Sequence, residues 1–526
     1  MVLSVLYAKS DIAFIARRQV FMKTNILDYL ETTESRFPGK TAVTDGKKSY
    51  SYTEVKENAQ AIGTALSYMT SPQTPVGIFA DKSADILCTF FGAVYAGCFY
   101  SVISPTLPQE RIKKIYSVLT PAVIVAQDET KEDAERIFTN SKIVTPDELM
   151  CFKKDENRLE KIRNSSIDTN PLYLNFTSGS TGTPKGIAVS HRSVLDFIDC
   201  FCDIFNITDK DIVANQAPFD FDVSVKDIYS CLKTGATLDI IPRSLFSSPK
   251  ELTDRLCEDK VTTMIWAVSA LCLISTFHCL DYRTPDTVNK VLFSGEVMPY
   301  KHLKAWREHL SEAMFVNLYG PTEITCNCTY HILEKDRDYS QGIPIGKHFP
   351  NEDVILLDKD DKRVTESGVQ GEICVRGSAL ALGYYNCPEQ NSTHFVQNPL
   401  NSYYPETIYR TGDLARYDEN GELVFAGRKD FQIKHMGHRI ELEEVQRAME
   451  AIDGVERCCC IFDAVKSKLK GFYTGTIDKK ELHLKMEKTL PVFMIPGMLR
   501  RVDFMPLTKN GKIDRKALEE KAKVKA

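Results

Sequence analysis

A loop around residue 180 carries the residue types that hold phosphate groups in proteins. The apolar run 173–176 precedes it, and a lysine followed by a glycine ends it. Hydroxyl and backbone N–H groups can donate to phosphate oxygens, glycine lets the backbone come close, and lysine adds positive charge. The spacing is not that of the Walker phosphate loop. The alternative, a surface linker rich in Ser, Thr and Gly, is disfavoured by the lysine and by the strand-like run. The candidate phosphate-binding residues are Thr177, Ser178, Gly179, Ser180, Thr181, Gly182, Thr183 and Lys185.

Two carboxylates further along the chain sit on tight turns. Glu323 ends the proline-stiffened segment Y-G-P-T-E, and one such carboxylate suits Mg²⁺, which takes one or two protein oxygens beside phosphate. Taken alone, Glu323 would more often be a helix-capping carboxylate. Asp413 follows a glycine in R-T-G-D-L, so we expect its carboxylate to be free to accept two hydroxyl groups. An isolated aspartate after glycine is more often a turn residue, so the surrounding motifs decide both assignments.

The order of the apolar runs predicts the elements that position these residues. From about residue 40 to 430, strand-like runs such as V-G-I-F-A (76–80) and K-V-L-F-S (290–294) alternate with helical ones. This alternation predicts an α/β fold with parallel sheet and helices on its faces. Residues 352–427 show short strands separated by Gly and Asn-Gly turns, which predict a small antiparallel β-rich subdomain. A strand–helix–strand pattern restarts after Asp430, where we expect a domain boundary.

Composition and charge restrict the class of protein. The 526 residues include 66 Lys and Arg against 71 Asp and Glu, a net charge of −5, which argues against a general nucleic-acid binder. No run approaches the ~18 apolar residues of a membrane span. The 16 cysteines form no paired metal-binding modules and favour reduced thiols in the cytoplasm. Residues 466–526 hold 16 Lys and Arg against 7 Asp and Glu. This basic end predicts either a docking face for an acidic partner or an ordinary solvated tail.

Several motifs in fixed order give the chain a family likeness. Besides the phosphate loop they are A-P-F-D-F-D-V-S-V-K-D (217–227), N-L-Y-G-P-T-E (317–323), G-E-I-C-V-R-G (371–377), Y-R-T-G-D-L (409–414), G-R-K-D-F-Q-I-K-H-M-G-H-R-I-E-L-E-E-V (427–445) and L-T-K-N-G-K-I-D-R (507–515). With these motifs the chain resembles the adenylate-forming superfamily, which includes acyl- and aryl-CoA ligases, luciferases and the adenylation domains of nonribosomal peptide synthetases. The resemblance implies a large N-terminal domain of βα subdomains at 22–430, including the β-rich part at 352–427. A small mobile α+β domain at 431–526 would follow it, and residues 1–21 are a possible N-terminal extension.

The resemblance assigns roles at an ATP site. It implies that Glu323, helped by Thr181, positions Mg²⁺, and that Asp413 binds the ribose. Lys512 would bridge the two reactants while a substrate carboxylate attacks the α-phosphorus, and so stabilise the negative charge that builds up. Taken alone, Lys512 would be one surface lysine among many. The other implied nucleotide-binding residues are Asn317, Tyr319, Gly320, Thr322 and Arg428, of which Asn317 and Tyr319 hold and stack adenine.

The resemblance also implies a second half-reaction. Family members rotate the C-terminal domain about the acidic residue of the G-R-x-D motif, here Asp430, and present the segment 434–439 in place of the loop of Lys512. Lys434 is a family position in this segment, and Gly437 would let a phosphopantetheine arm pass close to the backbone. Only residues 513–526 follow Lys512. We therefore expect the phosphopantetheine on a separate, acidic carrier protein that docks near the basic C-terminal domain.

Within the superfamily the chain looks most like amino-acid-activating members, in particular D-alanine:carrier-protein ligases. Asp222 occupies the position whose carboxylate pairs with the substrate α-ammonium, and a buried aspartate is costly unless it is paired. The chain departs from the D-alanine ligases at 266–271, where they have Thr-Pro. Lys226 lies one helical turn after Asp222, so it would pair with a polar or acidic substrate side chain or reach solvent. The implied substrate-pocket residues are Asp222, Val223, Lys226, Ala267, Leu292, Ser294, Leu318 and Cys326.

Three functions remain in competition on the sequence alone. The first, which we expect, is ATP-dependent adenylation of an amino acid followed by thioester transfer to the carrier protein. The second keeps the adenylation step but uses free CoA, and Asp222 counts against it. The third is a non-catalytic nucleotide-binding regulatory protein, and the presence of both Lys512 and Glu323 counts against it.

Overall fold

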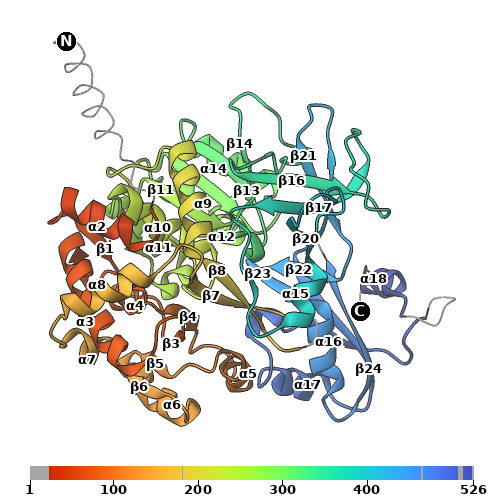
Figure 1. The fold of residues 1–526 in the computed structure, drawn as a ribbon. Helices are drawn as coiled ribbons and strands as arrows, with labels where there is room; N and C mark the ends of the chain where they lie inside the picture. The colour runs from red at the N-terminus through yellow and green to blue at the C-terminus, as the bar shows by residue number, and fades with distance from the viewer. Residues whose placement is uncertain (1–22, 180–181, 464–465, 508–512, 524–526) are drawn as a thin grey trace.

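The computed structural model describes residues 23–179, 182–463, 466–507 and 513–523 (Figure 1). The possible extension 1–21 and the site residues Ser180, Thr181 and Lys512 lie outside the described residues. Two large sheets, a β-rich sheet and a C-terminal lobe make up the described part, in which no helix combines the length and apolarity needed to cross a membrane.

The largest sheet has nine strands in the order β15-β14-β13-β12-β11-β9-β10-β1-β2. The strands from β13 to β1 in this order run parallel, whereas β14, β15 and β2 pair antiparallel at the edges. The sequence predicted parallel sheet, and the edges depart from it because connections without a crossover helix can only return antiparallel. The strands are β1 (Thr41–Thr44), β2 (Ser49–Ser51), β9 (Ile212–Asn215), β10 (Thr237–Ile240), β11 (Thr263–Ala267), β12 (Lys290–Ser294), β13 (Met314–Tyr319), β14 (Thr329–Ile332) and β15 (Lys347–His348).

The second sheet has seven strands in the order β18-β8-β7-β4-β3-β5-β6. Strands β3 to β7 in it are parallel, and the hairpin β7–β8 encloses the candidate phosphate loop. The strands are β3 (Pro75–Phe79), β4 (Phe99–Ile103), β5 (Val123–Ala126), β6 (Lys142–Val144), β7 (Pro171–Thr177), β8 (Lys185–Ser190) and β18 (Gly383–Tyr384). The loop therefore joins two antiparallel strands, which is a different setting from a strand–loop–helix phosphate site.

Helices fill the space between and around the two sheets. The main hydrophobic core joins α3, α4, α9 and α10 to strands of both sheets, for example through Phe91, Phe201 and Tyr229. A capping box between Ser51 and Glu54 starts α3, and Gly235 in the left-handed region ends α10. The helices of this body are α2 (Leu27–Arg36), α3 (Tyr52–Met69), α4 (Ala84–Tyr95), α5 (Gln109–Leu119), α6 (Lys131–Ile137), α7 (Pro146–Met150), α8 (Glu156–Ser165), α9 (His191–Phe205), α10 (Val223–Thr234), α11 (Pro249–Glu258), α12 (Val268–Thr276), α13 (Cys279–Tyr282) and α14 (Tyr300–His309).

The β-rich part is a five-stranded antiparallel sheet in the order β16-β17-β20-β19, with β21 on β20. Its strands are β16 (Glu352–Leu357), β17 (Gln370–Gly377), β19 (Phe395–Gln397), β20 (Thr407–Tyr417) and β21 (Leu423–Arg428), and α15 (Pro388–His394) precedes β19. The predicted α/β fold class with a β-rich subdomain is confirmed. One segment departs from the predicted subdomain, because β18 leaves it to pair with β8 of the second sheet.

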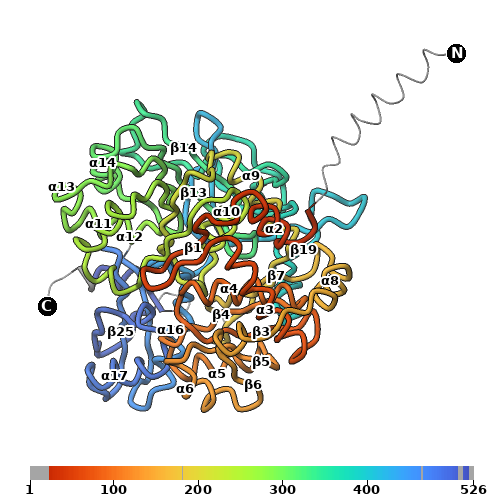
Figure 2. The backbone as a smooth tube through the Cα atoms, turned by 90° about the vertical axis from the view of Figure 1, so that its left-hand side faces the viewer, coloured from red at the N-terminus to blue at the C-terminus, as the bar shows by residue number. Residues whose placement is uncertain are grey.

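The C-terminal lobe has its own core and lies beside α5 and below the β-rich sheet (Figures 1 and 2). It opens with the hairpin β22 (Gln432–His435)–β23 (His438–Glu441), and α16 (Leu442–Glu450) follows. The rest is a three-stranded sheet with two helices: β24 (Val455–Asp463), β25 (Lys468–Gly475), α17 (Lys479–Met486), β26 (Met498–Arg501) and α18 (Arg515–Lys523). This arrangement is α+β, as predicted.

The positions of the cysteines follow from the fold. Along β24, Cys458 and Cys460 face the core with α16, whereas Cys459 faces the opposite core beneath α18. This alternation is what a strand imposes on consecutive residues. All 16 cysteines lie in the described part of the chain and are free thiols, and Cys151 after α7 is the one that is exposed.

Candidate active site

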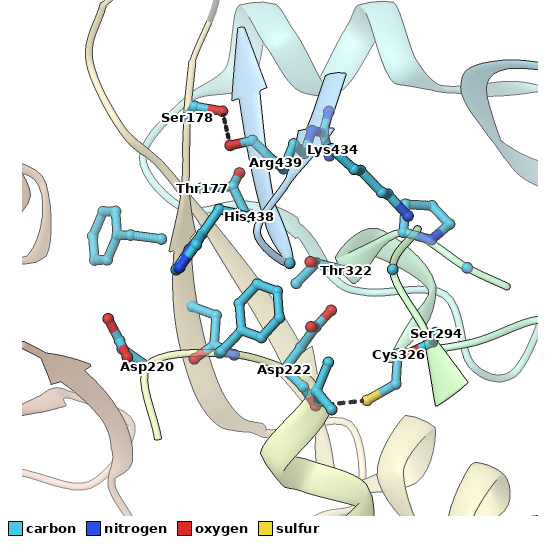
Figure 3. Close-up of a pocket in the computed structure, with 18 of the residues that line it drawn as sticks. Thr177, Ser178, Asp220, Asp222, Ser294, Thr322, Cys326, Lys434, His438 and Arg439 are labelled. Atoms are coloured by element: carbon cyan, nitrogen blue, oxygen red, sulfur yellow. Dashed lines mark hydrogen bonds between the residues drawn. The ribbon is translucent and has the colours of Figure 1, made fainter. Parts of the chain in front are cut away.

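A cavity lies between the large body and the hairpin β22–β23 (Figure 3). It brings together residues from four distant motifs of the sequence. The polar residues of the large body that line it include Thr177, Ser178, Asp222, Ser294, Thr322 and Asp413. The predicted phosphate, ribose and substrate residues therefore meet at one place, where the strands of two sheets and the β-rich sheet end, whereas Glu323 does not line this cavity.

The candidate phosphate loop is buried at both of its ends. Ser178 is 2% exposed and Lys185 is 6% exposed, which counts against the alternative of a surface linker at these two ends, whereas Thr183 between them is exposed. Thr177 Oγ1 is buried and has no hydrogen-bond partner among the described residues. Such an orphaned hydroxyl costs about 1–3 kcal/mol unless a partner binds to it. The loop thus presents an unsatisfied donor at the cavity.

Gly179 and Lys185 of this loop occupy different surroundings. A Cβ on Gly179 would lie 2.1 Å from the carbonyl oxygen of Thr183, so only glycine fits there. The Lys185 ammonium lies 5.3 Å from the centre of the Tyr384 ring. Burial and the nearby Arg439 charge lower the pKa of Lys185. The lysine lines a neighbouring charged cavity instead of the one lined by Thr177.

Glu323 is fully buried in a short 3₁₀ turn at 322–324. Arg439 Nη1 donates to both of its carboxylate oxygens, at 2.8 and 2.9 Å, and the Tyr384 hydroxyl donates to Oε1 at 2.8 Å. Burial by itself would raise the pKa of the Glu323 carboxyl, but the Arg439 charge and the Tyr384 hydrogen bond lower it to about 2. The carboxylate is therefore held ionised, in a state suited to binding a cation.

Asp413 is not free in the way that the sequence predicted. The Tyr319 hydroxyl donates to its Oδ2 at 2.5 Å, and Arg428 donates to its Oδ1. Arg428 also donates to both oxygens of Asp430, at 2.6 and 2.8 Å, and so links the predicted ribose residue to the predicted hinge. Each carboxylate oxygen has two acceptor positions, so each oxygen of Asp413 can still accept one hydroxyl group.

The other predicted nucleotide residues differ in how they face the cavity. Gly320 and Thr322 line it, and a Cβ on Gly320 would lie 2.4 Å from the Cα of Asn327. Asn317 is buried and donates to the Pro344 carbonyl at 2.9 Å, outside the cavity lining. The Tyr319 ring is 7% exposed and lies behind the Asp413 carboxylate.

Asp222 presents a buried carboxylate to the cavity from the start of α10 (Figure 3). Burial raises the pKa of this carboxyl, and a hydrogen bond with Thr322 and the Lys226 charge lower it in part. No Lys or Arg of the described residues forms an ion pair with it. Because a buried carboxylate is strongly destabilising without a counter-charge, the cavity is suited to a ligand that carries a cation.

The remaining predicted substrate residues divide into two groups. Val223, Ser294 and Cys326 line the cavity beside Asp222, and the Cys326 thiol donates to the Asp222 carbonyl at 3.1 Å. The others do not line it: they are Lys226, Ala267, Leu292 and Leu318, of which Leu292 and Leu318 lie in the main core.

Lys226 is buried rather than directed to solvent. It is 1% exposed, and its ammonium donates to Asn327 Oδ1 at 2.7 Å and to Ser294 Oγ at 3.4 Å. The alternative that this lysine reaches solvent is therefore wrong. Burial lowers the pKa of Lys226. The two groups that hold it, Ser294 and Asn327, both line the cavity.

The hairpin β22–β23 closes the opposite side of the cavity. Gly437, with a φ of 79°, donates its N–H to Glu296 Oε1 at 2.6 Å, and the Lys434 ammonium lies 5.8 Å from the centre of the Tyr319 ring. The Ser178 hydroxyl donates to the Arg439 carbonyl at 2.8 Å. The segment predicted for the second half-reaction therefore faces the cavity in this structure.

Sequence reasoning missed several residues of this site. Arg439 and His438 stood in the quoted segment 434–439 but received no role, because Arg439 lies 116 positions from Glu323 in the sequence and only the fold brings the two together. The His438 ring stacks on Phe493 at 3.7 Å in the cavity wall. Tyr384 and Glu296 gave no signal, because pairing of β18 with β8 and docking of the hairpin bring them to the site.

Fold and cavity together define a class: a two-part α/β protein with a phosphate-type loop and buried carboxylates at the junction. Residues 30–385 match the family model described as AMP-binding enzyme. Zwittermicin A synthase ZmaJ of Bacillus cereus is 32% identical over 514 residues, covering 94% of this chain and 95% of that protein. The chain belongs to the AMP-binding enzyme family, which confirms the predicted membership of the adenylate-forming superfamily.

Other relatives are much longer than this chain. Bacitracin synthase 1 of Bacillus licheniformis is 32% identical over 502 residues, which cover 94% of this chain but only 9% of that protein. Among solved structures, the crystal structure of IdnL1 matches with a TM-score of 0.81 and 27% identity, covering 92% of this chain and 99% of that one. The Vibrio cholerae adenylation domain AlmE, in complex with glycyl-adenosine-5'-phosphate, has the same fold with a TM-score of 0.82 at 20% identity.

Proposed function

We propose that this protein adenylates an amino acid with ATP and then transfers the aminoacyl group to the phosphopantetheine thiol of a separate carrier protein. The observation that carries the proposal is the buried Asp222 carboxylate, which has no ion pair among the described residues and faces the cavity of the phosphate loop. An α-ammonium group would supply the counter-charge. The glycyl adenylate named for the AlmE structure is a product of the proposed class.

The residues present fit ATP and Mg²⁺. The orphaned Thr177 hydroxyl and the loop that follows it would bind phosphate oxygens, and Asp413 keeps an acceptor position on each oxygen for ribose hydroxyls. Glu323, together with Thr181, would hold Mg²⁺, which neutralises phosphate charge and orients the phosphates. The adenine and ribose would lie against Asn317, Tyr319, Gly320, Thr322 and Arg428.

In the first step an oxygen of the substrate carboxylate would bond to the α-phosphorus, while the bond from that phosphorus to the bridging oxygen breaks and pyrophosphate leaves. Asp222 would hold the α-ammonium and thereby orient the carboxylate. Lys512 would stabilise the charge on the reacting phosphate. Lys226, held by Ser294 and Asn327 at the cavity wall, would favour a polar or acidic substrate side chain.

In the second step the carrier thiol would replace AMP on the acyl carbon. Domains 22–430 and 431–526 would alternate about Asp430 between the two steps, and the segment with Lys434 and Gly437 would border the phosphopantetheine arm. Support comes from a structural neighbour described as an NRPS protein containing adenylation and PCP domains, at 23% identity and TM-score 0.81. The basic residues of 466–526 would attract an acidic carrier.

ATP–pyrophosphate exchange, screened over L- and D-amino acids and simple carboxylic acids, tests the proposal. We expect exchange with amino acids only. Exchange with carboxylic acids and thioester formation on free CoA would favour the CoA-ligase alternative. Nucleotide binding without exchange for any substrate would favour the non-catalytic regulatory protein.

A further inference from the structure

One contact between the hairpin and the large body is an ion pair at a buried carboxylate. Glu323 lies on the large body, and its charge is balanced by Arg439 of β23, whose side chain is 13% exposed. Glu323 Oε1 accepts from both Arg439 and Tyr384, which uses the two acceptor positions of that oxygen. Oε2 accepts from Arg439 as well. The guanidinium therefore covers both oxygens.

A divalent metal needs the same positions. Mg²⁺ binds carboxylate oxygens at about 2.0–2.1 Å and demands octahedral space around itself. Arg439 Nη1, at 2.8 and 2.9 Å from the two oxygens of Glu323, fills that space with a positive charge. A metal ion bound at Glu323 would be repelled by the guanidinium, which already contacts both oxygens. The two cations would therefore compete for one carboxylate.

Loss of one cation from Glu323 costs little free energy only if the other cation replaces it. Glu323 is 0% exposed, so removing Arg439 alone would leave a buried anion that has lost its ion pair, with Lys185 as a nearby positive charge that makes no ion pair with it. Arg439 is itself incompletely satisfied, because its Nε is buried with no hydrogen-bond partner among the described residues. The hairpin carries Arg439 on a lobe whose hydrophobic core is separate from the main core.

We propose that Arg439 and a divalent metal ion are alternative counter-ions of Glu323, so that metal binding and docking of the hairpin exclude each other. This inference rests on the proposed function, because the metal at Glu323 is part of it. By linkage, each event weakens the other by the same factor. Metal-bound nucleotide would release the hairpin, and loss of metal with the departing pyrophosphate would let Arg439 return to Glu323.

Two measurements on the full chain test this. Titration calorimetry gives the affinity for α,β-methylene-ATP with Mg²⁺ and with EDTA, and hydrogen exchange gives the protection of the Gly437 amide, which donates to Glu296 only when the hairpin is docked. In the wild type we expect the analogue with Mg²⁺ to speed exchange at Gly437, and the analogue with EDTA to leave it unchanged. Arg439→Met should bind the Mg²⁺ complex about tenfold more tightly and exchange fast without metal.

The controls separate this inference from the proposed function. Arg457→Met removes an exposed arginine of the same lobe and should behave as the wild type. Glu323→Gln should lose the effect of Mg²⁺ on affinity. If Arg439→Met is unstable, Arg439→Lys and the hydrogen exchange of the wild type still test whether metal binding and hairpin docking exclude each other. The inference alone is overturned if Arg439→Met leaves the affinity for the Mg²⁺ complex unchanged, or if Mg²⁺ does not change the protection of Gly437. If the wild type does not bind the analogue at all, the inference and the proposed function are both overturned.

Discussion

Arg111 on α5 and Glu444 on α16 form a buried ion pair between the large body and the C-terminal lobe, with 2.7 Å between Nη1 and Oε1. The side chains are 9% and 6% exposed. Together with the pair of Glu323 and Arg439, this ion pair holds the docked lobe by charge through two different sets of residues. The following predictions concern this interface and the cavity.

Breaking the Arg111–Glu444 pair should loosen the docked lobe. Glu444→Met leaves the Arg111 charge buried and uncompensated, which costs about 3–5 kcal/mol in docking. The double variant Arg111→Met/Glu444→Met should recover most of the loss, because neither charge remains. Hydrogen exchange in α5 and α16 measures the docking. Equal protection in the single and double variants would contradict this prediction.

Asp222→Asn should impair use of the amine substrate but not binding of the nucleotide. The amide cannot balance an α-ammonium charge, so kcat/KM for the preferred amino acid should fall about a hundredfold or more. Asp220→Asn changes a second carboxyl of the same cavity and is the matched control. Pyrophosphate exchange and ATP titration measure the two effects. A comparable fall in Asp220→Asn would remove the special role of Asp222.

Lys226→Met should change the amino-acid profile toward apolar side chains. The buried ammonium is held by Ser294 and Asn327, and a thioether of similar length cannot attract a polar substrate group. Pyrophosphate exchange over an amino-acid panel measures the profile. Lys210→Met, at an exposed position, controls for loss of charge. An unchanged profile would show that Lys226 serves the fold alone.

Acidification should weaken docking of the hairpin through His438. Burial and the charges of Arg243, Arg111 and His435 lower the pKa of His438 to about 4. Because the docked state binds fewer protons than the open state between pH 6.5 and 4, docking is strongest above pH 6.5 and weakens as the pH falls through this window.

The expected loss from His438 is about 2 kcal/mol at pH 4.5. His438→Phe keeps the stacking on Phe493 but cannot titrate, so its Gly437 amide should stay protected over the same range. His278→Gln, at an exposed position, should follow the wild type. Hydrogen exchange at Gly437 against pH provides the measurement, and parallel profiles for wild type and His438→Phe would refute the assignment.

Loading of the carrier should be more sensitive to salt than adenylate formation. The first depends on attraction between an acidic partner and the basic residues of 466–526, and salt screens such surface charges over about 10 Å at 0.1 M. The second depends on buried groups such as Glu323 and Asp222, which salt reaches poorly. Thioester formation and pyrophosphate exchange, followed from low to high salt, compare the two. Equal sensitivity of both steps would exclude electrostatic docking.

The sequence predicted the fold class and the meeting of distant motifs because both follow from local patterns. Alternating strands and helices were readable, and Thr177, Asp222 and Asp413 do share a cavity. The contacts between individual side chains could not be predicted from the sequence, because they depend on which helices and strands pack together. Two such contacts join residues about a hundred positions apart: the ion pair of Glu323 with Arg439 and the hydrogen bond from Tyr319 to Asp413.

Burial of individual side chains was equally hard to predict. Helical spacing correctly associates Lys226 with Asp222, but it cannot distinguish a lysine that reaches solvent from one enclosed by Asn327 and Ser294. Leu292 and Leu318 occupy positions of the family pocket, yet neighbouring strands enclose both in the main core. Family likeness fixes position along a strand more reliably than it fixes which side chains reach the cavity.

The distribution of thiols offers a way to follow the two parts of the molecule. Since Cys151 is the exposed cysteine of the described chain and lies on the large body, a maleimide fluorophore should attach there without removal of the eleven buried cysteines, once the partly exposed Cys200, Cys257, Cys272 and Cys387 are replaced. A second dye at Arg457→Cys would mark the C-terminal lobe. Energy transfer between the two dyes would then report docking and release in single molecules during turnover.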